Sequence, residues 1–137
     1  MGGTSDRSRS FEFPGEYYEI IRGDFRDTNA EVTFLKSYLP EGGRVLDIGC
    51  GTGTVLRVLA SDGFTCVGVD RSASFIDYAR QQGGDPVYHL TPAHEFNTDE
   101  RFDVIVAMFV TLNYLTHEEV RETLRRCRTW LRPGQCR

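Results

Sequence analysis

Three alternating glycines and two carboxylates stand out in the first half of the chain. The glycines are Gly49, Gly51 and Gly53, and Asp47 lies two residues ahead of them. Alternating glycines let a backbone turn sharply and approach a ligand without a side-chain clash. Asp70 follows the loop, and its carboxylate can accept both hydroxyls of a ribose in strong charge-assisted hydrogen bonds. The pattern predicts a site for a ligand that contains a nucleoside.

The spacing of the glycines separates two cofactor classes that share a free ribose diol, the nicotinamide dinucleotides and S-adenosylmethionine. A dinucleotide loop has the pattern G-x-G-x-x-G, and its third glycine would fall at Thr54 or Leu56. A phosphate-binding G-x-x-x-x-G-K-[ST] pattern is absent from the sequence as well. The loop therefore favours S-adenosylmethionine, with a nicotinamide-dependent oxidoreductase as the alternative.

Hydrophobic periodicity predicts helices and strands that alternate along the chain. The expected helices cover residues 16–27, 28–39, 55–62, 72–82 and 116–131. The expected strands cover residues 44–48, 65–69, 87–90 and 102–108. Continuous apolar strands between helices are typical of a parallel sheet that is covered on both faces. Because crossover connections are right-handed, the predicted fold is α/β, a three-layer, Rossmann-like, doubly wound sheet.

Local signals define the helix ends. Capping boxes are expected at Thr28–Glu31 and Thr116–Glu119, and Ser72 is an expected N-cap. The last helix is expected to bury one face, formed by Val120, Leu124, Cys127 and Leu131. Ligands of such sheets bind outside the carboxyl ends of the strands. The glycine loop, which follows the first strand, is therefore the expected site.

Four segments, in order, resemble the motifs of class I S-adenosylmethionine-dependent methyltransferases. Residues 45–53 (VLDIGCGTG) resemble the first motif of that family nearly letter for letter. Residues 67–72 are similar to its second motif, and 102–108 to its fourth strand. Residues 131–134 resemble the turn before its fifth strand. The resemblance covers almost the whole chain and implies S-adenosyl-L-methionine as the cofactor.

The resemblance also implies a role for each matching position. Cofactor contacts are implied for Asp47, Gly49, Cys50, Gly51, Gly53, Asp70, Arg71, Ala93, Glu95 and Met108. Asp47 would reach the methionine amino group, and Asp70 would hold the ribose. Arg71 and the segment 93–95 would meet the adenine, although Thr91-Pro92 occupies the place where the family often has an Asp.

Two tyrosines are candidates for the catalytic, acceptor-facing side of the site. An N-terminal tyrosine often closes over the cofactor in small-molecule enzymes of this family, which makes Tyr17 the candidate; for Tyr17 and its neighbour Tyr18, lid and core roles both stay open. Residues 108–115 resemble the matching segment of amino-sugar N,N-dimethyltransferases and glycine-type N-methyltransferases, with Tyr114 where the sugar enzymes have a histidine. A neutral amine acceptor needs no base, so we expect methyl transfer to nitrogen of a small molecule. A cofactor-binding module without its own acceptor site remains the alternative.

Composition and hydrophobic spacing predict a disordered polar tail at 1–10 and a helical cover at 11–43, and the resemblance implies an incomplete methyltransferase domain at 44–137. The family's sheet continues after the Pro-Gly turn with a fifth strand and a hairpin, whereas this chain ends at Arg137. We therefore expect a C-terminally truncated chain that lacks those strands.

The composition and charge of the chain argue against several kinds of partner and location. The net charge of −4 argues against a nucleic-acid surface, although methylation of RNA or protein stays open. No apolar run is long enough to span a bilayer, and the N-terminus lacks a signal-peptide core. The four cysteines and three histidines show no metal-binding or disulfide spacing. We expect a cytoplasmic protein without a bound metal; the sequence does not indicate its oligomeric state.

Overall fold

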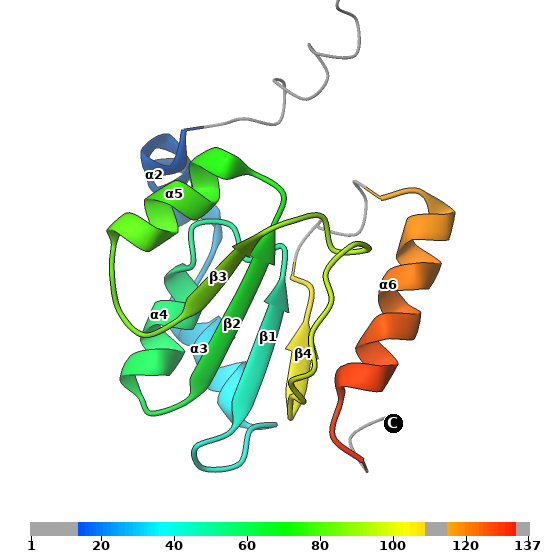
Figure 1. Cartoon of the computed structure of the whole chain (residues 1–137). Helices are drawn as coiled ribbons and strands as arrows, with labels where there is room; N and C mark the ends of the chain where they lie inside the picture. Colours follow the sequence, from blue (N-terminus) through cyan, green and yellow to red (C-terminus); the bar gives the residue numbers. More distant parts are fainter. Residues whose placement is uncertain (1–13, 109–114, 134–137) are drawn as a thin grey trace, which may run out of the picture.

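The computed structural model describes residues 14–108 and 115–133. These residues form a four-stranded sheet in which every neighbouring pair of strands is parallel (Figure 1). The strands are β1 (Arg44–Ile48), β2 (Thr65–Asp70), β3 (Val87–Leu90) and β4 (Val104–Val106). Their order in the sheet is β3-β2-β1-β4. The predicted parallel α/β sheet is confirmed.

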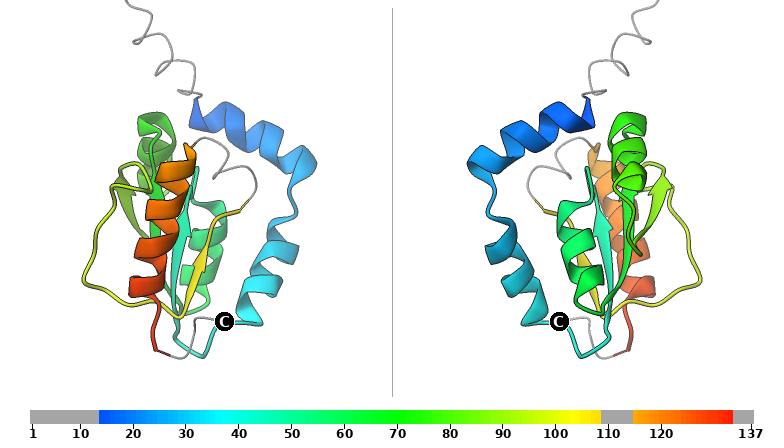
Figure 2. Two further views of the ribbon diagram at one scale, coloured as in Figure 1. Left: turned by 90° about the vertical axis from the view of Figure 1, so that its right-hand side faces the viewer. Right: turned by 90° about the vertical axis from the view of Figure 1, so that its left-hand side faces the viewer.

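Five helices are described around this sheet. They are α2 (Gly15–Phe25), α3 (Thr28–Lys36), α4 (Thr54–Ser61), α5 (Ala73–Gln81) and α6 (His117–Trp130). Helices α3, α4 and α5 share one core cluster on one face of the sheet. Helix α6 belongs to a second cluster on the other face, and the two side views show it on the opposite side of the sheet from α3 (Figure 2). This gives the expected three layers.

The alternation of side chains in β1 builds both layers at once. Val45 packs into the cluster under α3, α4 and α5, while Leu46 and Ile48 pack into the cluster under α6. All three side chains are almost fully buried. A strand that is apolar on both faces is what a sheet between two helical layers requires.

Successive strands are added in one direction across the sheet from β1 to β3, and β4 is added on the other side of β1. After β1 the chain enters α4 on one face, and after β4 it reaches α6 on the other face. Such a switch point opens a crevice at the carboxyl ends of the strands. Helix α2 lies at this end of the molecule, beside α5 (Figure 1).

The predicted start of α3 was wrong. The N-cap is Asp27, whose side chain accepts a hydrogen bond from the Ala30 amide, and not Thr28. Glu31, the expected partner in a capping box, instead bonds two arginines of the preceding segment. The helix therefore keeps a local cap, one residue earlier than predicted, and tertiary ion pairs engage Glu31 instead of the capping box.

The predicted strand 102–108 was too long. Phe102 forms an isolated parallel bridge with Leu131. Buried Asp103 accepts a hydrogen bond from the Arg44 amide at 2.8 Å and pairs with Arg132 at 3.2 Å. Asp103 therefore joins the start of β1 to the segment after α6, and regular pairing with β1 begins only at Val104.

The capping box at Thr116 and Glu119 is confirmed. The predicted apolar face of α6 was wrong at Leu124, because the helix buries the preceding residue instead. Leu124 is 57% exposed, while Thr123 and Trp130 are buried. The Trp130 ring packs edge-on against Phe96 at a centroid distance of 5.3 Å. The large indole determines which face of the helix turns inward.

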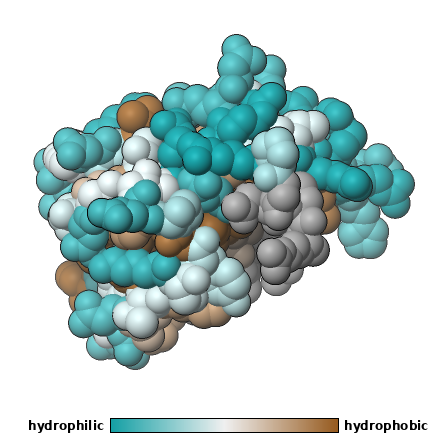
Figure 3. Space-filling view, turned by 90° about the horizontal axis from the view of Figure 1, so that it is seen from below, coloured by the Kyte–Doolittle hydropathy of each residue, from teal (hydrophilic) through white to brown (hydrophobic). Residues whose placement is uncertain are grey.

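The amino ends of the strands form the opposite end of the molecule. Seen from below, this end is mostly hydrophilic with separate apolar patches (Figure 3). A pocket there is lined by residues that begin β1, β2 and β3, among them Arg44, Thr65 and Val87. It lies far from the glycine loop and is not the predicted site. Among residues 14–108 and 115–133, no helix is long and apolar enough to cross a membrane.

Candidate functional site

The glycine loop connects β1 to α4 at the switch point of the sheet. Gly49, Gly51 and Gly53 all adopt left-handed backbone conformations, with φ of 77°, 58° and 78°. A Cβ atom at residue 53 would also lie 2.8 Å from the Tyr88 ring, which stands on β3 beneath the loop. Only glycine satisfies both the conformation and the close approach at this position.

Asp70 holds the glycine loop from the tip of β2. Its Oδ2 accepts a hydrogen bond from the Gly51 amide at 2.8 Å, and its Oδ1 accepts one from the Ser72 amide at 2.9 Å. Burial raises the pKa of Asp70, while these two backbone amides oppose the shift. A carboxylate has about four acceptor positions. Asp70 therefore retains acceptor capacity for ligand hydroxyls.

Asp47 is buried below the loop, and its Oδ1 atom has no hydrogen-bond partner among the described residues. Burial raises the pKa of Asp47 to about 7; Arg26 opposes this shift, and the nearby charge of Asp70 adds to it. A buried carboxylate oxygen without a partner is costly. An ammonium group arriving from a ligand would remove that cost.

Helix α2 covers the loop from above. The ring of Tyr18 reaches to 3.7 Å from the position that a Cβ of Gly51 would take. The same ring packs on Phe75 of α5 with centroids 4.8 Å apart. Gly15 approaches Tyr78 of α5 so closely that a Cβ at residue 15 would overlap its side chain. The loop is thus enclosed between β1 and α2.

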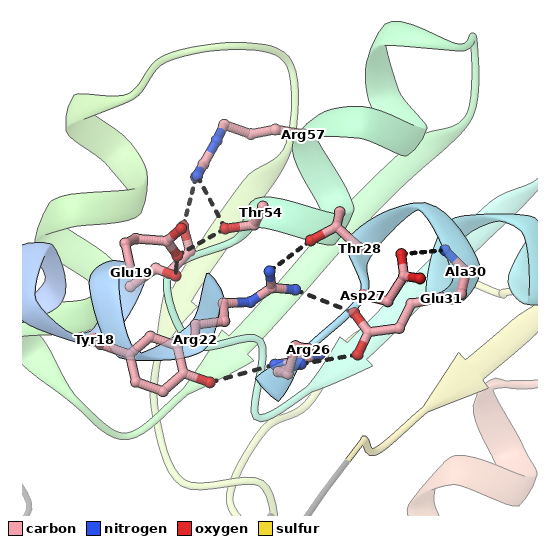
Figure 4. Close-up of polar contacts among 11 residues, drawn as sticks. Tyr18, Glu19, Arg22, Arg26, Asp27, Thr28, Ala30, Glu31, Thr54 and Arg57 are labelled. Carbon is pink, nitrogen blue, oxygen red and sulfur yellow. Dashed lines mark hydrogen bonds and ion pairs between the residues drawn. The ribbon is translucent and has the colours of Figure 1, made fainter. Parts of the chain in front are cut away.

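Two arginines of the α2 segment converge on one carboxylate of α3 (Figure 4). Arg22 lies 3.1 Å from Glu31 and donates to the Thr28 hydroxyl at 2.6 Å. Arg26 lies 2.8 Å from Glu31 and donates to the Tyr18 hydroxyl at 3.3 Å. The three charged side chains of this Arg22–Glu31–Arg26 cluster are at most 13% exposed. The two arginines of this cluster lower the pKa of Asp47, whereas the charge of Glu31 raises it.

A second polar contact joins α2 directly to the loop. Glu19 accepts hydrogen bonds from the hydroxyls of Thr52 and Thr54, the latter at 2.7 Å (Figure 4). Arg57 donates to the Thr52 carbonyl oxygen at 2.5 Å and to the Thr54 hydroxyl at 3.4 Å. The loop is therefore held from α2 on one side and from α4 on the other.

The structure brings most of the predicted loop residues together. Cys50 is buried in the core under α4, and its thiol lies close to Gly68 of β2. Burial raises the pKa of this thiol well above its ordinary value, so Cys50 acts as a small packing residue. Met108 packs against the same core cluster, beyond β4. Arg71 is exposed at the tip of β2, next to Asp70.

The remaining predicted residues lie on other segments of the chain or outside the described structure. Ala93 packs against the cluster on the α6 face, and Glu95 is exposed beside His94. Tyr17 is 55% exposed on α2. Tyr114 lies outside the described residues. Both remain predictions as catalytic residues.

Sequence reasoning missed the polar residues of the α2 segment that contact the loop and α3. Glu19, Arg22 and Arg26 recur at spacings of three and four, so they share a helix face with Tyr18. The apolar residues of α2 drew attention to the other face. A polar face with two arginines and a glutamate, just ahead of a nucleoside-binding loop, is the signal that could have revealed them.

Comparison with known proteins agrees with this geometry. A family model described as "Methyltransferase domain" matches residues 45–134. A dTDP-3-amino-3,4,6-trideoxy-alpha-D-glucopyranose N,N-dimethyltransferase of Streptomyces venezuelae is 30% identical, over 88% of this chain and 48% of its own length. A ubiquinone biosynthesis O-methyltransferase of Bradyrhizobium sp. is 39% identical, over 68% of this chain and 37% of its own length.

Solved structures show the same fold. The S-adenosylmethionine-bound amino pentose methyltransferase CalS10 of Micromonospora echinaspora superposes with a TM-score of 0.76 at 26% identity. That match covers 87% of this chain and 52% of CalS10. The chain thus spans about half the length, or less, of the relatives it matches. From its motifs, its sheet and these matches, the chain belongs to the methyltransferase domain family of the class I, S-adenosylmethionine-dependent methyltransferases.

Proposed function

We propose that this chain is the S-adenosylmethionine-binding part of an enzyme that methylates a nitrogen atom of a small molecule. The observation that carries the proposal is the unpartnered, buried Oδ1 of Asp47 beneath a left-handed glycine loop. It lies in the electrostatic field of Asp70 on the neighbouring strand and of Arg26 on the α2 side. Alternating negative and positive charge of this kind matches a ligand that is itself an amino acid joined to a nucleoside.

The described residues fit that cofactor. Asp47 would hold its ammonium group, and the positive charge of Arg26 would favour its carboxylate. Asp70, already fixed by two backbone amides, would accept the ribose hydroxyls with its remaining lone pairs. Gly51 and Gly53 leave room for close approach of the methionine chain. Arg71, Ala93 and Glu95 are retained as proposed adenine neighbours.

The reaction requires little from the protein beyond orientation. The bound cofactor supplies a methyl group that its sulfonium already activates. The loop and α2 would fix the direction of that group and exclude water. Holding two reactants in line in this way accounts for roughly 7–11 kcal/mol of a barrier. Tyr17 and Tyr114 remain the proposed acceptor-facing residues.

Nitrogen is the proposed acceptor atom because the amino-sugar relatives act on amines and a neutral amine needs no base. Oxygen is the second candidate, since two of the relatives are ubiquinone biosynthesis O-methyltransferases. A small-molecule acceptor, rather than nucleic acid, agrees with the net charge of −4. A cytoplasmic location is part of the same proposal.

Binding and turnover can be tested separately. Calorimetric titration should show binding of S-adenosylhomocysteine and none of NAD. Transfer of a labelled methyl group to an amino-sugar nucleotide, compared with a catechol, then tests the acceptor. Binding without transfer to either acceptor would favour a cofactor-binding module. Binding of NAD without S-adenosylhomocysteine would overturn the proposed function.

A further inference from the structure

Helix α4 begins without a cap of its own. Its N-cap is Gly53, which makes no side-chain hydrogen bond, and its first turn contains no acidic residue. The amino end of a helix carries unpaired amides and a partial positive charge. An Asp, Asn, Ser or Thr at the N-cap commonly accepts hydrogen bonds from these amides. Here the need for glycine in the loop has removed that option.

Glu19 of α2 provides the missing negative charge from a distant part of the chain. One of its oxygens, Oε1, accepts hydrogen bonds from both Thr52 and Thr54. Thr52 is almost fully buried, and Thr54 is the first residue of α4. The carboxylate therefore lies at the amino end of α4, on the side where the glycine loop enters the helix.

The contact continues into α4 itself. The Thr54 hydroxyl donates to Glu19 and accepts from Arg57, and Arg57 also donates to the Thr52 carbonyl oxygen. Charged groups at both ends strengthen such a chain of hydrogen bonds. Movement of α2 would therefore alter the positions of the two threonines that flank Gly53.

We infer that Glu19 is a positioning residue that couples the seating of α2 to the shape of the glycine loop, and so tightens binding of the cofactor. This inference rests on the proposed function. When Glu19 is in place, Tyr18 of the same helix lies over Gly51. The position of Tyr18 over the loop and the conformation of the loop are thereby fixed together.

Removal of the Glu19 charge is expected to leave the fold intact, because α2 has two other attachments. Arg22 and Arg26 bind Glu31 of α3, and Tyr18 packs on Phe75 of α5. The expected loss is therefore local. It concerns the order of the loop and the affinity for the cofactor.

The test compares Glu19→Gln with Glu16→Gln, a matched change of an exposed acid on the same helix. In the ligand-free chain, hydrogen exchange of amides 51–57 should accelerate in Glu19→Gln alone, while amides of α6 stay unchanged. S-adenosylhomocysteine should bind Glu19→Gln about tenfold more weakly than wild type, and Thr54→Val should add little in the Glu19→Gln background.

Three outcomes are distinguishable. The inference would be overturned if Glu19→Gln and Glu16→Gln showed the same hydrogen exchange of amides 51–57 and the same affinity for S-adenosylhomocysteine. Fully additive effects of Glu19→Gln and Thr54→Val would overturn it as well, since the two side chains would then act independently. Failure of the wild-type chain to bind S-adenosylhomocysteine would refute the proposed function, and the exchange measurement would still decide whether Glu19 shapes the loop.

Discussion

The carboxylate of Asp70 lies 2.8 Å from the backbone amide of Gly51 and accepts its hydrogen bond. Asp70 ends β2, and Gly51 lies in the loop after β1, the strand that pairs in parallel with β2. The acid that the proposed function assigns to the ribose therefore also fixes the loop assigned to the methionine chain. The two halves of the proposed cofactor site depend on one side chain.

The raised pKa of Asp47 predicts that the free energy of unfolding falls as pH rises. Its pKa is raised to about 7, above the 3.8 of an unperturbed carboxyl group. The folded chain thus keeps a proton that the unfolded chain releases between these two values, so the free energy of unfolding decreases as pH rises through that window, by at most about 1.4 kcal/mol per pH unit. Chemical denaturation of wild type and Asp47→Asn at several pH values should show a steeper decline for wild type. Parallel pH profiles would refute the assignment of this proton to Asp47.

The same carboxyl group predicts the pH dependence of binding. An ammonium group pairs with Asp47 only when it is ionised, so affinity for S-adenosylhomocysteine should rise as pH passes through about 7 and then level off. Titration calorimetry at pH 6 and pH 8 measures this rise. Asp47→Asn should bind weakly at both values, and an affinity that tracks wild type at both would contradict the proposed contact.

Gly53→Ala should disrupt the loop more than Gly63→Ala. Both residues have a positive φ, so alanine costs about 1 kcal/mol of backbone strain at either position. Only at residue 53 would the new Cβ also meet Tyr88, whereas nothing lies within 4 Å at residue 63. Thermal unfolding should show a larger loss for Gly53→Ala, together with loss of S-adenosylhomocysteine binding. Equal losses of stability in the two variants would show that the contact between a Cβ at residue 53 and Tyr88 costs no free energy.

Glu31→Gln should destabilise the cover formed by α2 and α3. Removal of one partner from a largely buried ion cluster leaves the two arginines uncompensated and costs about 3 kcal/mol. Glu118→Gln is the control, because Glu118 pairs with Arg121 on the exposed face of α6. The control should unfold at the wild-type denaturant midpoint. A Glu31→Gln midpoint equal to that of the control would mean that the Arg22–Glu31–Arg26 cluster does not hold α2.

Most of the fold could be predicted from the chain itself. Apolar runs such as 44–48 and the glycines that bound them give strands and turns that depend on local residues. The ion pairs of Glu31 and the inward face of α6 could not be predicted in this way. Both depend on distant partners, Arg22 for Glu31 and Phe96 for Trp130, whose proximity exists only in the folded chain.

The site was predictable where its residues lie close together in sequence and not where a helix folds over them. The prediction of the loop and of Asp70 follows from spacing, and that of Asp47 from the resemblance of residues 45–53 to a family motif. The role of α2 does not, because its apolar residues Ile20, Ile21 and Phe25 remain 48% to 70% exposed. Its buried face instead carries charged residues, and their burial makes sense only once Glu31 and the threonines of the loop are seen opposite them.

The most direct test of the account is the affinity of Asp70→Asn for S-adenosylhomocysteine, measured by titration calorimetry beside Asp77→Asn, a change of an exposed acid on α5. Asparagine keeps the shape of the side chain but loses the charge and one acceptor oxygen. Charge-assisted hydrogen bonds of about 1.5–3 kcal/mol predict a loss of roughly tenfold to a hundredfold for Asp70→Asn, with wild-type affinity for Asp77→Asn. Wild-type affinity in a folded Asp70→Asn chain would contradict the proposed cofactor site.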